Sequence, residues 1–104
     1  MKIVINNILP PKGFKCINLF GVLFCRSIMN NIDINHEKIH TAQMKEMLYV
    51  FFYIWYVIEW LIRLLIYWDS WKAYKTISFE QEAYDNQSNL SYLNNRKHYS
   101  WLNY

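Results

Sequence analysis

Two histidines and a glutamate stand at a spacing that suits metal chemistry. His36, Glu37 and His40 read H-E-x-x-H in the sequence. Side chains four residues apart lie on one face of an α-helix, so both imidazoles can point at the same place. This arrangement holds a zinc ion, and the glutamate beside it can act as general base toward a zinc-bound water. The spacing therefore predicts Zn²⁺ bound by His36 and His40, with Glu37 as the catalytic residue.

A catalytic zinc site needs a third protein ligand and keeps a fourth position for water. The longer motif H-E-x-x-H-x-x-G-x-x-H would supply a histidine, but Gln43 and Glu46 occupy its glycine and histidine positions. A carboxylate from a later helix is the other solution. Glu80 is the best candidate and Glu82 is its rival. Helical residues two positions apart point about 200° away from each other, so at most one of the two can face the metal.

The two histidines require a helix, and the sequence around them predicts one over residues 34–46. A polar stretch precedes it, and either Asn31 or Asp33 can serve as its N-cap. Gln43 lies one turn beyond His40. It either orients a ligand or substrate, or it is an ordinary glutamine on the helix surface.

The next segment, residues 47–68, is the most apolar of the chain. It carries only two charges, Glu59 and Arg63, which stand four apart in the order that favours a helical ion pair. Tyr56 lies on the same side. A helix of this length can span a bilayer, but both charges would fall near its middle. Membrane contact, either spanning or interfacial, therefore stays open beside a soluble core helix completed by a second subunit.

A glutamate-bearing helix is predicted over residues 78–95. A soft break at Asp69 separates it from the apolar segment. Ser78 and Gln81 have the spacing of a capping box, and Glu80 falls in the first turn that follows. The predicted third ligand thus comes from a helix with a defined start.

The residues before the H-E-x-x-H helix predict strands. Residues 14–27 are rich in β-branched and aromatic side chains, and Gly21 divides them into one bent strand or a short β-hairpin. Such a strand either aligns an extended peptide beside the metal or simply belongs to the core. Cys16 and Cys25 are expected as small apolar side chains of this strand pair, with a disulfide or a metal role as the alternative. Residues 1–13 form an N-terminal segment.

These elements predict a single α+β domain over residues 1–104, minimal and zincin-like, with a short N-terminal β-hairpin or bent strand followed by three helices. The net charge is only +3, with both signs mixed, which argues against nucleic acid as a partner. No secretory signal is expected, because Pro10 and Pro11 interrupt a short apolar run. The expected location is cytoplasmic or membrane-associated, without a cleavable signal peptide. A homo-oligomer is one option.

The motif also resembles a known pattern. Residues 36–40, His-Glu-Lys-Ile-His, together with residues 79–84, Phe-Glu-Gln-Glu-Ala-Tyr, are similar to the gluzincin metallopeptidases, in which H-E-x-x-H is followed by a glutamate-bearing helix. The chain also resembles small uncharacterised bacterial H-E-x-x-H proteins over most of its length. The resemblance implies a zinc-dependent peptidase fold. It places Glu80 in the third-ligand position, because Glu80 precedes Ala83 by three.

One position departs from the gluzincin pattern. In one branch of that family, an aspartate supports a histidine ligand from behind, and it would fall at Tyr84 here. The resemblance implies that Tyr84 or Asp85 takes its place next to the ligand.

The predicted function is that of a zinc-dependent metallopeptidase-like hydrolase, which cleaves peptide bonds in a peptide or protein substrate through metal-activated water. His98 either stabilises an oxyanion or lies in solvent. The alternative function is a small membrane-associated interaction protein with a structural or inactive H-E-x-x-H site. Membrane contact through residues 47–68 favours this alternative, as does a chain too short for a deep substrate cleft.

Overall fold

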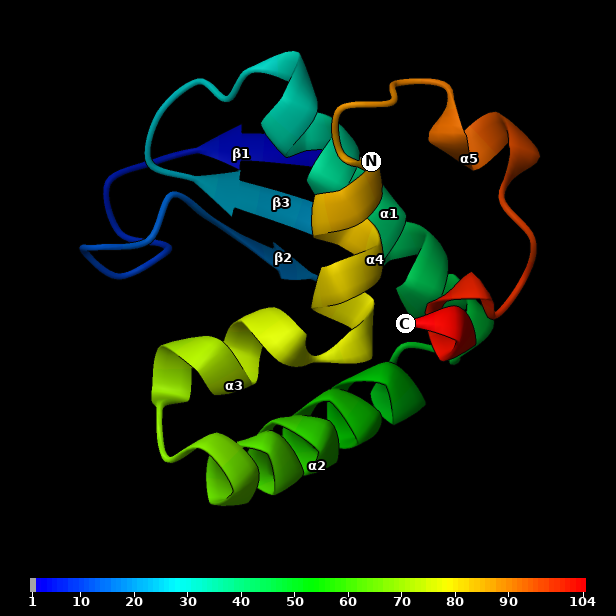
Figure 1. The fold of residues 1–104 in the computed structure, drawn as a ribbon. Helices are drawn as coiled ribbons and strands as arrows, with labels where there is room; N and C mark the ends of the chain where they lie inside the picture. The colour runs from blue at the N-terminus through cyan, green and yellow to red at the C-terminus, as the bar shows by residue number, and fades with distance from the viewer. Residues whose placement is uncertain (1) are drawn as a thin grey trace.

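The computed structural model describes residues 2–104 and has an α+β fold, which confirms the predicted class. Figure 1 shows the strands at one side of the molecule and the helices around the other. In chain order the elements are β1 (Lys2–Ile5), β2 (Cys16–Leu19), β3 (Val22–Cys25), α1 (Asn31–Glu46), α2 (Val50–Tyr67), α3 (Ser70–Thr76), α4 (Ser78–Asn86), α5 (Tyr92–Asn95) and the 3₁₀ helix η1 (Ser100–Asn103).

The strands form one sheet in the order β1-β3-β2. β2 and β3 are the predicted hairpin and pair antiparallel, whereas β1 pairs parallel to β3 on its other side. Phe20 and Gly21 join the hairpin with φ values of 53° and 87°. Two positive φ values are typical of the type I′ turn, whose twist matches that of the flanking strands. β1 was not predicted, although its sequence Lys-Ile-Val-Ile is rich in β-branched residues.

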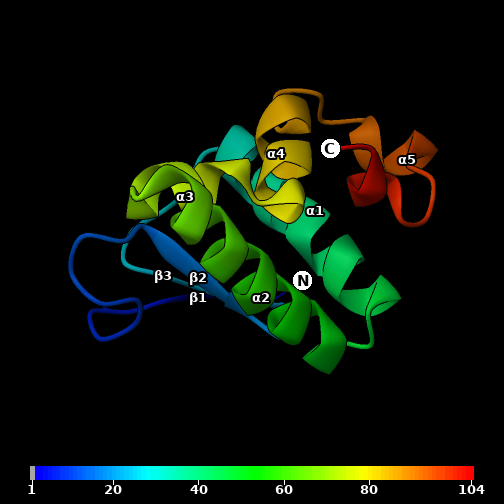
Figure 2. The ribbon, with the colours of Figure 1, turned by 60° about the horizontal axis from the view of Figure 1, so that its bottom comes forward.

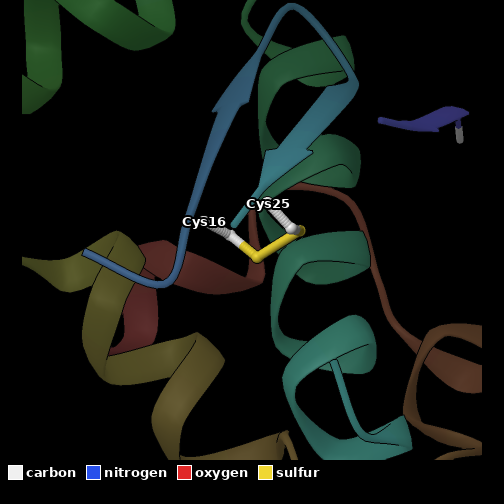
Figure 3. Close-up of a disulfide and its surroundings, with 2 residues drawn as sticks. All are labelled: Cys16 and Cys25. Carbon is white, nitrogen blue, oxygen red and sulfur yellow. A yellow bond between two sulfur atoms is a disulfide. The ribbon is translucent and has the colours of Figure 1, made fainter. Parts of the chain in front are cut away.

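The hairpin places its two cysteines directly opposite each other. Cys16 and Cys25 are partners in the β2–β3 register. Their sulfur atoms are joined in a disulfide (Figure 3). The expectation of two unbonded apolar side chains is therefore wrong, and the alternative of a disulfide is the one observed.

Helix α1 starts earlier than predicted because a different asparagine caps it. The side chain of Asn30 accepts a hydrogen bond from the Asp33 backbone N–H at 2.8 Å. The N-cap is therefore neither Asn31 nor Asp33, and the helix gains three residues at its start. Within the fold α1 packs against β2 and α4, and His36 and His40 lie on the side that it buries.

Helix α2 is separated from its neighbours by backbone turns rather than by glycine or proline. Leu48 and Tyr49 before it and Trp68 after it have φ values of 53°, 60° and 55°. Only Phe52 of the helix is buried. Among the described residues, α2 is the one helix whose length and composition would allow it to cross a membrane.

The region predicted as one helix over residues 78–95 is divided into α4 and α5, and α3 before it was not predicted. The predicted capping box does not form. Glu59 of α2 accepts hydrogen bonds from the Ser78 N–H and Oγ–H, each at 2.8 Å, while Gln81 donates to the Thr76 carbonyl at 2.6 Å. The start of α4 is therefore satisfied by a carboxylate from another helix. The predicted ion pair is present, with Arg63 Nη2 3.5 Å from Glu59 Oε1.

A buried apolar cluster lies where α1, α2, α4 and the C-terminal segment meet. Its members are Met44, Phe52, Ile77, Phe79 and Trp101. The last turn, η1, returns to the C-terminal end of α1 (Figure 1), which brings Trp101 onto the Phe79 ring at a centroid distance of 4.6 Å. This cluster holds α1 and α4 side by side, and those two helices carry the predicted metal ligands.

Candidate metal centre

The three predicted ligands converge in the interior between α1 and α4. His36 Nε2 and His40 Nε2 lie 3.2 Å and 3.0 Å from the same oxygen of Glu80, and 3.1 Å from each other. All three side chains are nearly closed to solvent, with exposed fractions of 7%, 5% and 4%. The structure therefore brings Glu80, and not Glu82, to the two histidines of the H-E-x-x-H motif.

The spacing of these atoms suits a small tetrahedral cation. Zinc binds nitrogen and carboxylate oxygen at about 2.0–2.1 Å, which places two tetrahedral ligands about 3.3–3.4 Å apart. The observed separations of 3.0–3.2 Å fall within a few tenths of an ångström of that value. One His-His-Glu set of this kind leaves the fourth tetrahedral direction to a water or substrate.

Gln43 fixes the tautomer of His40. The Gln43 amide N–H groups donate to Glu82 Oε1 at 2.9 Å and to the Phe79 carbonyl at 3.0 Å. Both of these partners are acceptors, so the amide oxygen must face the other way, where it lies 2.8 Å from His40 Nδ1. His40 Nδ1 therefore carries the proton, and His40 Nε2 presents a lone pair to the centre. Gln43 is fully buried, so the ordinary surface glutamine is excluded.

Gln87 is the matching partner of His36 and was missed in the sequence. Its Oε1 lies 2.9 Å from His36 Nδ1. The bond that the gluzincin resemblance assigned to Tyr84 or Asp85 therefore comes from Gln87. Tyr84 instead packs its ring edge-on against His36, at a centroid distance of 4.5 Å. Gln87 follows Glu80 by seven positions, so helical spacing alone could have indicated it.

Three lone pairs facing one point require a positive charge between them. In the protein without metal, a proton can take that place. Burial by itself would lower the pKa of His40, but the neighbouring Glu80 carboxylate raises it to about 9. Burial would raise the pKa of Glu80, yet His40, the hydrogen bonds from both histidines and the Tyr56 hydroxyl together lower it. Glu80 is therefore a carboxylate, as a metal ligand must be.

Glu37 lies on α1 beside the two ligand histidines and is half-buried. Burial raises the pKa of the Glu37 carboxyl, and the charges of His40 and His36 offset part of that shift. Asn18 of β2 hydrogen-bonds to the Glu37 side chain and donates to its backbone carbonyl at 3.1 Å. A carboxylate with a raised pKa next to the ligands has the chemistry of a general base.

Glu82 faces a second polar cluster on the other side of α4. Arg96 binds Glu82 with its Nε 2.5 Å from Oε2, and it also pairs with Glu46 of α1. Burial would raise the pKa of Glu82, but hydrogen bonds from Arg96, Tyr92 and Gln43 lower it. Glu82 thus supports the centre through Gln43 rather than by binding a metal.

His98 lies outside the centre. Its side chain is 89% exposed, and its Nδ1 is 3.7 Å from Glu46 Oε1. The candidate role in stabilising an oxyanion is therefore wrong, and the alternative of a histidine in solvent is the one observed.

Aromatic side chains cover the centre. Phe52 of α2 packs edge-on at a centroid distance of 6.3 Å from His40, and the Tyr56 hydroxyl donates to Glu80 Oε2 at 2.6 Å. Two cavities on the protein are lined by other residues, and none of the three ligands borders either of them.

Comparisons with known proteins give no match to a family model, a curated protein or a solved structure. The similarity to gluzincins therefore rests on the motif and its helix alone.

Proposed function

We propose that the protein is a zinc-dependent metallopeptidase-like hydrolase that cleaves peptide bonds. The observation that carries this proposal is the convergence of His36 Nε2, His40 Nε2 and Glu80 Oε1 within 3.2 Å of one another. Each histidine is also held with its protonated nitrogen turned away from the centre. Ligand number, donor type and ligand orientation thus agree with a zinc site that keeps one position open.

The residues around the centre have distinct roles in this proposal. A bound zinc ion supplies the Lewis acid that activates water at neutral pH. The Glu37 carboxylate takes a proton from the attacking water and returns it to the leaving amine. The raised pKa of Glu37 lies nearer the pH at which a general base is most effective. Tyr56 holds the second oxygen of Glu80, which keeps the first oxygen aimed at the histidines.

A peptide substrate has an edge strand available beside Glu37. β2 is an edge of the sheet, and its Asn18 side chain reaches the Glu37 backbone. The Tyr53 hydroxyl occupies part of that edge, since it donates to the Asn18 carbonyl and accepts from the Phe20 N–H, both at 3.0 Å. An extended peptide that pairs with β2 would replace these two bonds with main-chain bonds.

The variant Glu37→Gln tests the catalytic role. It keeps the shape and the metal ligands but removes the base, so zinc content should match that of the wild type. Peptide hydrolysis should fall by about 10²–10⁴-fold. The assay is cleavage of a fluorogenic peptide mixture by zinc-loaded protein. Asp85→Asn, at an exposed carboxylate of α4, is the matched control that keeps activity. Equal rates of hydrolysis for the wild type and Glu37→Gln would contradict the proposed hydrolase mechanism.

A structural zinc site is the second candidate. It is favoured by the burial of all three ligands and by the aromatic cover over His40 and Glu80. In that case zinc contributes to folding rather than to turnover. Zinc-loaded wild type would then cleave no peptide, while removal of the metal with a chelator would lower the unfolding midpoint.

Of the two predicted locations, cytoplasmic and membrane-associated, we propose that the protein is membrane-associated. The exposed apolar residues of α2 support this choice, and the Cys16–Cys25 disulfide favours a position outside the reducing cytosol.

A further inference from the structure

Helix α2 has its polar side turned inward and its apolar side turned outward. Every exposed residue of the helix, from Val50 to Ile66, is apolar. Every tyrosine of the helix and both of its charges lie on the other side, at partly buried positions. A helix on the surface of a soluble protein normally has the opposite arrangement, with its polar face in water.

The inward side is fastened to the rest of the protein by polar bonds. Glu59 binds the start of α4 through Ser78, and the Tyr56 hydroxyl donates to Glu80. These bonds fix which side of α2 faces out. The outward side is therefore a permanent feature of the fold.

In the described part of the chain, Trp101 packs edge-on against Trp55 at the flank of the outward side, at a centroid distance of 5.3 Å, while the middle of that side is exposed. In Figure 1 α2 forms one edge of the molecule, and in Figure 2, where that edge is turned toward the viewer, α2 crosses the front. Ile54, Ile58 and Leu65 along its middle have exposed fractions of 50%, 52% and 69%.

The width of the apolar surface indicates what covers it. At 100° per residue, the exposed positions fill an arc of about 180°, half of the circumference of the helix. A partner helix or a second copy of the chain packs against a much narrower stripe and would leave the flanks in water. A fluid hydrocarbon phase can contact the whole convex half.

The ends of α2 carry the side chains that suit a membrane interface. Trp68 and Trp71 follow the helix with exposed fractions of 83% and 64%, and Lys72 and Lys75 are exposed next to them. Lys45 is exposed just before the helix begins. Tryptophan prefers the headgroup level, and lysine is attracted to anionic lipid.

We propose that the outward half of α2 binds a lipid bilayer, with the helix axis lying in the plane of the interface. A spanning orientation would surround α2 with hydrocarbon, which would break the bonds of Glu59 and Tyr56 to the protein or draw polar helices into the membrane. The in-plane position keeps those bonds and buries only apolar side chains. This proposal of membrane binding does not depend on whether the centre binds a metal.

Co-sedimentation with lipid vesicles tests this proposal. Vesicles of phosphatidylcholine with a quarter phosphatidylserine should bind the full chain, and tryptophan emission should shift to the blue. Ile58→Glu should lower the partition coefficient by about ten-fold or more, and Ile58→Glu with Leu65→Glu should lower it further. Ile28→Glu is the matched control, because Ile28 is 85% exposed on the loop before α1. It should bind vesicles like the wild type.

Three outcomes would overturn the proposal. The wild type could remain in the supernatant with these vesicles. Ile28→Glu could lose as much binding as Ile58→Glu, which would show general hydrophobic adsorption. Light scattering could show a stable dimer that ignores vesicles and that Ile58→Glu dissociates, which would assign the surface to a second copy. Circular dichroism checks that all three variants fold, as expected for substitutions at exposed positions.

Discussion

At the scale of single residues, both ligand histidines are held by amides. Gln43 and Gln87 accept the Nδ1 protons of His40 and His36. A carboxylate in this place would add negative charge behind the ligand and make the imidazole more basic. With neutral amides, the charge that compensates a divalent cation comes from Glu80 and from the nearby Glu37.

Replacement of Gln43 should weaken zinc binding without removing a ligand. In Gln43→Leu, the orienting acceptor of His40 is lost, and zinc affinity should fall by about 10–100-fold. Competition with a chromogenic zinc chelator measures this change. Gln81→Leu is the control, because Gln81 donates to the Thr76 carbonyl and has no bond to the ligands. Wild-type zinc affinity in Gln43→Leu would show that the amide has no orienting role.

Much of this residue-level arrangement is accessible from the sequence, because it follows helical spacing. His36, His40 and Glu37 need only the rule that positions four apart share a face. The choice of Glu80 over Glu82 rested on its place just after the predicted cap at Ser78 and on the resemblance to gluzincins, since spacing alone left both open. Gln87 lies beyond the end of α4, where side-chain direction depends on the path of the backbone. Helical spacing can point to it but cannot establish its bond to His36.

At the scale of elements, the C-terminal segment joins the two helices of the centre. Arg96 is paired with Glu82 on α4 and with Glu46 near the end of α1, and its side chain is only 4% exposed. This buried arginine donates hydrogen bonds to both carboxylates and so links the two helices. The segment after α5 therefore determines how closely α1 and α4 approach each other.

Loss of this arginine should strongly destabilise the fold. Arg96→Met removes the guanidinium that both buried carboxylates share, so the free energy of unfolding should fall by about 3–5 kcal/mol. Urea denaturation followed by circular dichroism measures this loss. The neighbouring Lys97→Met changes an exposed side chain and should stay within about 0.5 kcal/mol of the wild type. A similar small effect of Arg96→Met would contradict the role of the arginine.

The same cluster predicts a loss of stability at high pH. Burial, together with the hydrogen bond to Glu82 at 2.6 Å, raises the pKa of Tyr92. The native state thus holds this proton more tightly than the unfolded chain, in which tyrosine titrates near about pH 10. The contribution of Tyr92 is fully present below pH 10 and is lost as the pH rises toward the folded-state pKa. Denaturant titrations between about pH 9 and 11.5 should therefore show a steeper loss for the wild type than for Tyr92→Phe. Parallel pH profiles would contradict this account.

The elements themselves are only partly predictable from local sequence. The hairpin and the helix with the H-E-x-x-H motif follow from composition and spacing. The boundaries at α3, α4 and α5 do not, because they depend on contacts between distant residues. Ser78 illustrates this point: its sequence suggests a local capping box, whereas Glu59 from α2 satisfies the helix start.

At the scale of the whole molecule, a polar centre lies beneath a helix whose outer side is apolar. The sequence shows the apolar character of residues 47–68 and places Tyr56 on the side of Glu59 and Arg63. It does not show that this side faces the protein, because that depends on how α2 packs against α1 and α4. In the fold, the candidate metal centre lies on the inward side of α2, and the exposed apolar residues lie on its outward side.

Zinc content is the most direct test of the centre. Protein purified with zinc present and dialysed should contain about one zinc ion per chain by elemental analysis. Asp85→Asn, at an exposed carboxylate of α4, should retain that content, whereas Glu80→Gln and His36→Ala should lose most of it. Zinc well below one per chain in the wild type, or an unchanged content in Glu80→Gln, would contradict the assignment of His36, His40 and Glu80 as metal ligands.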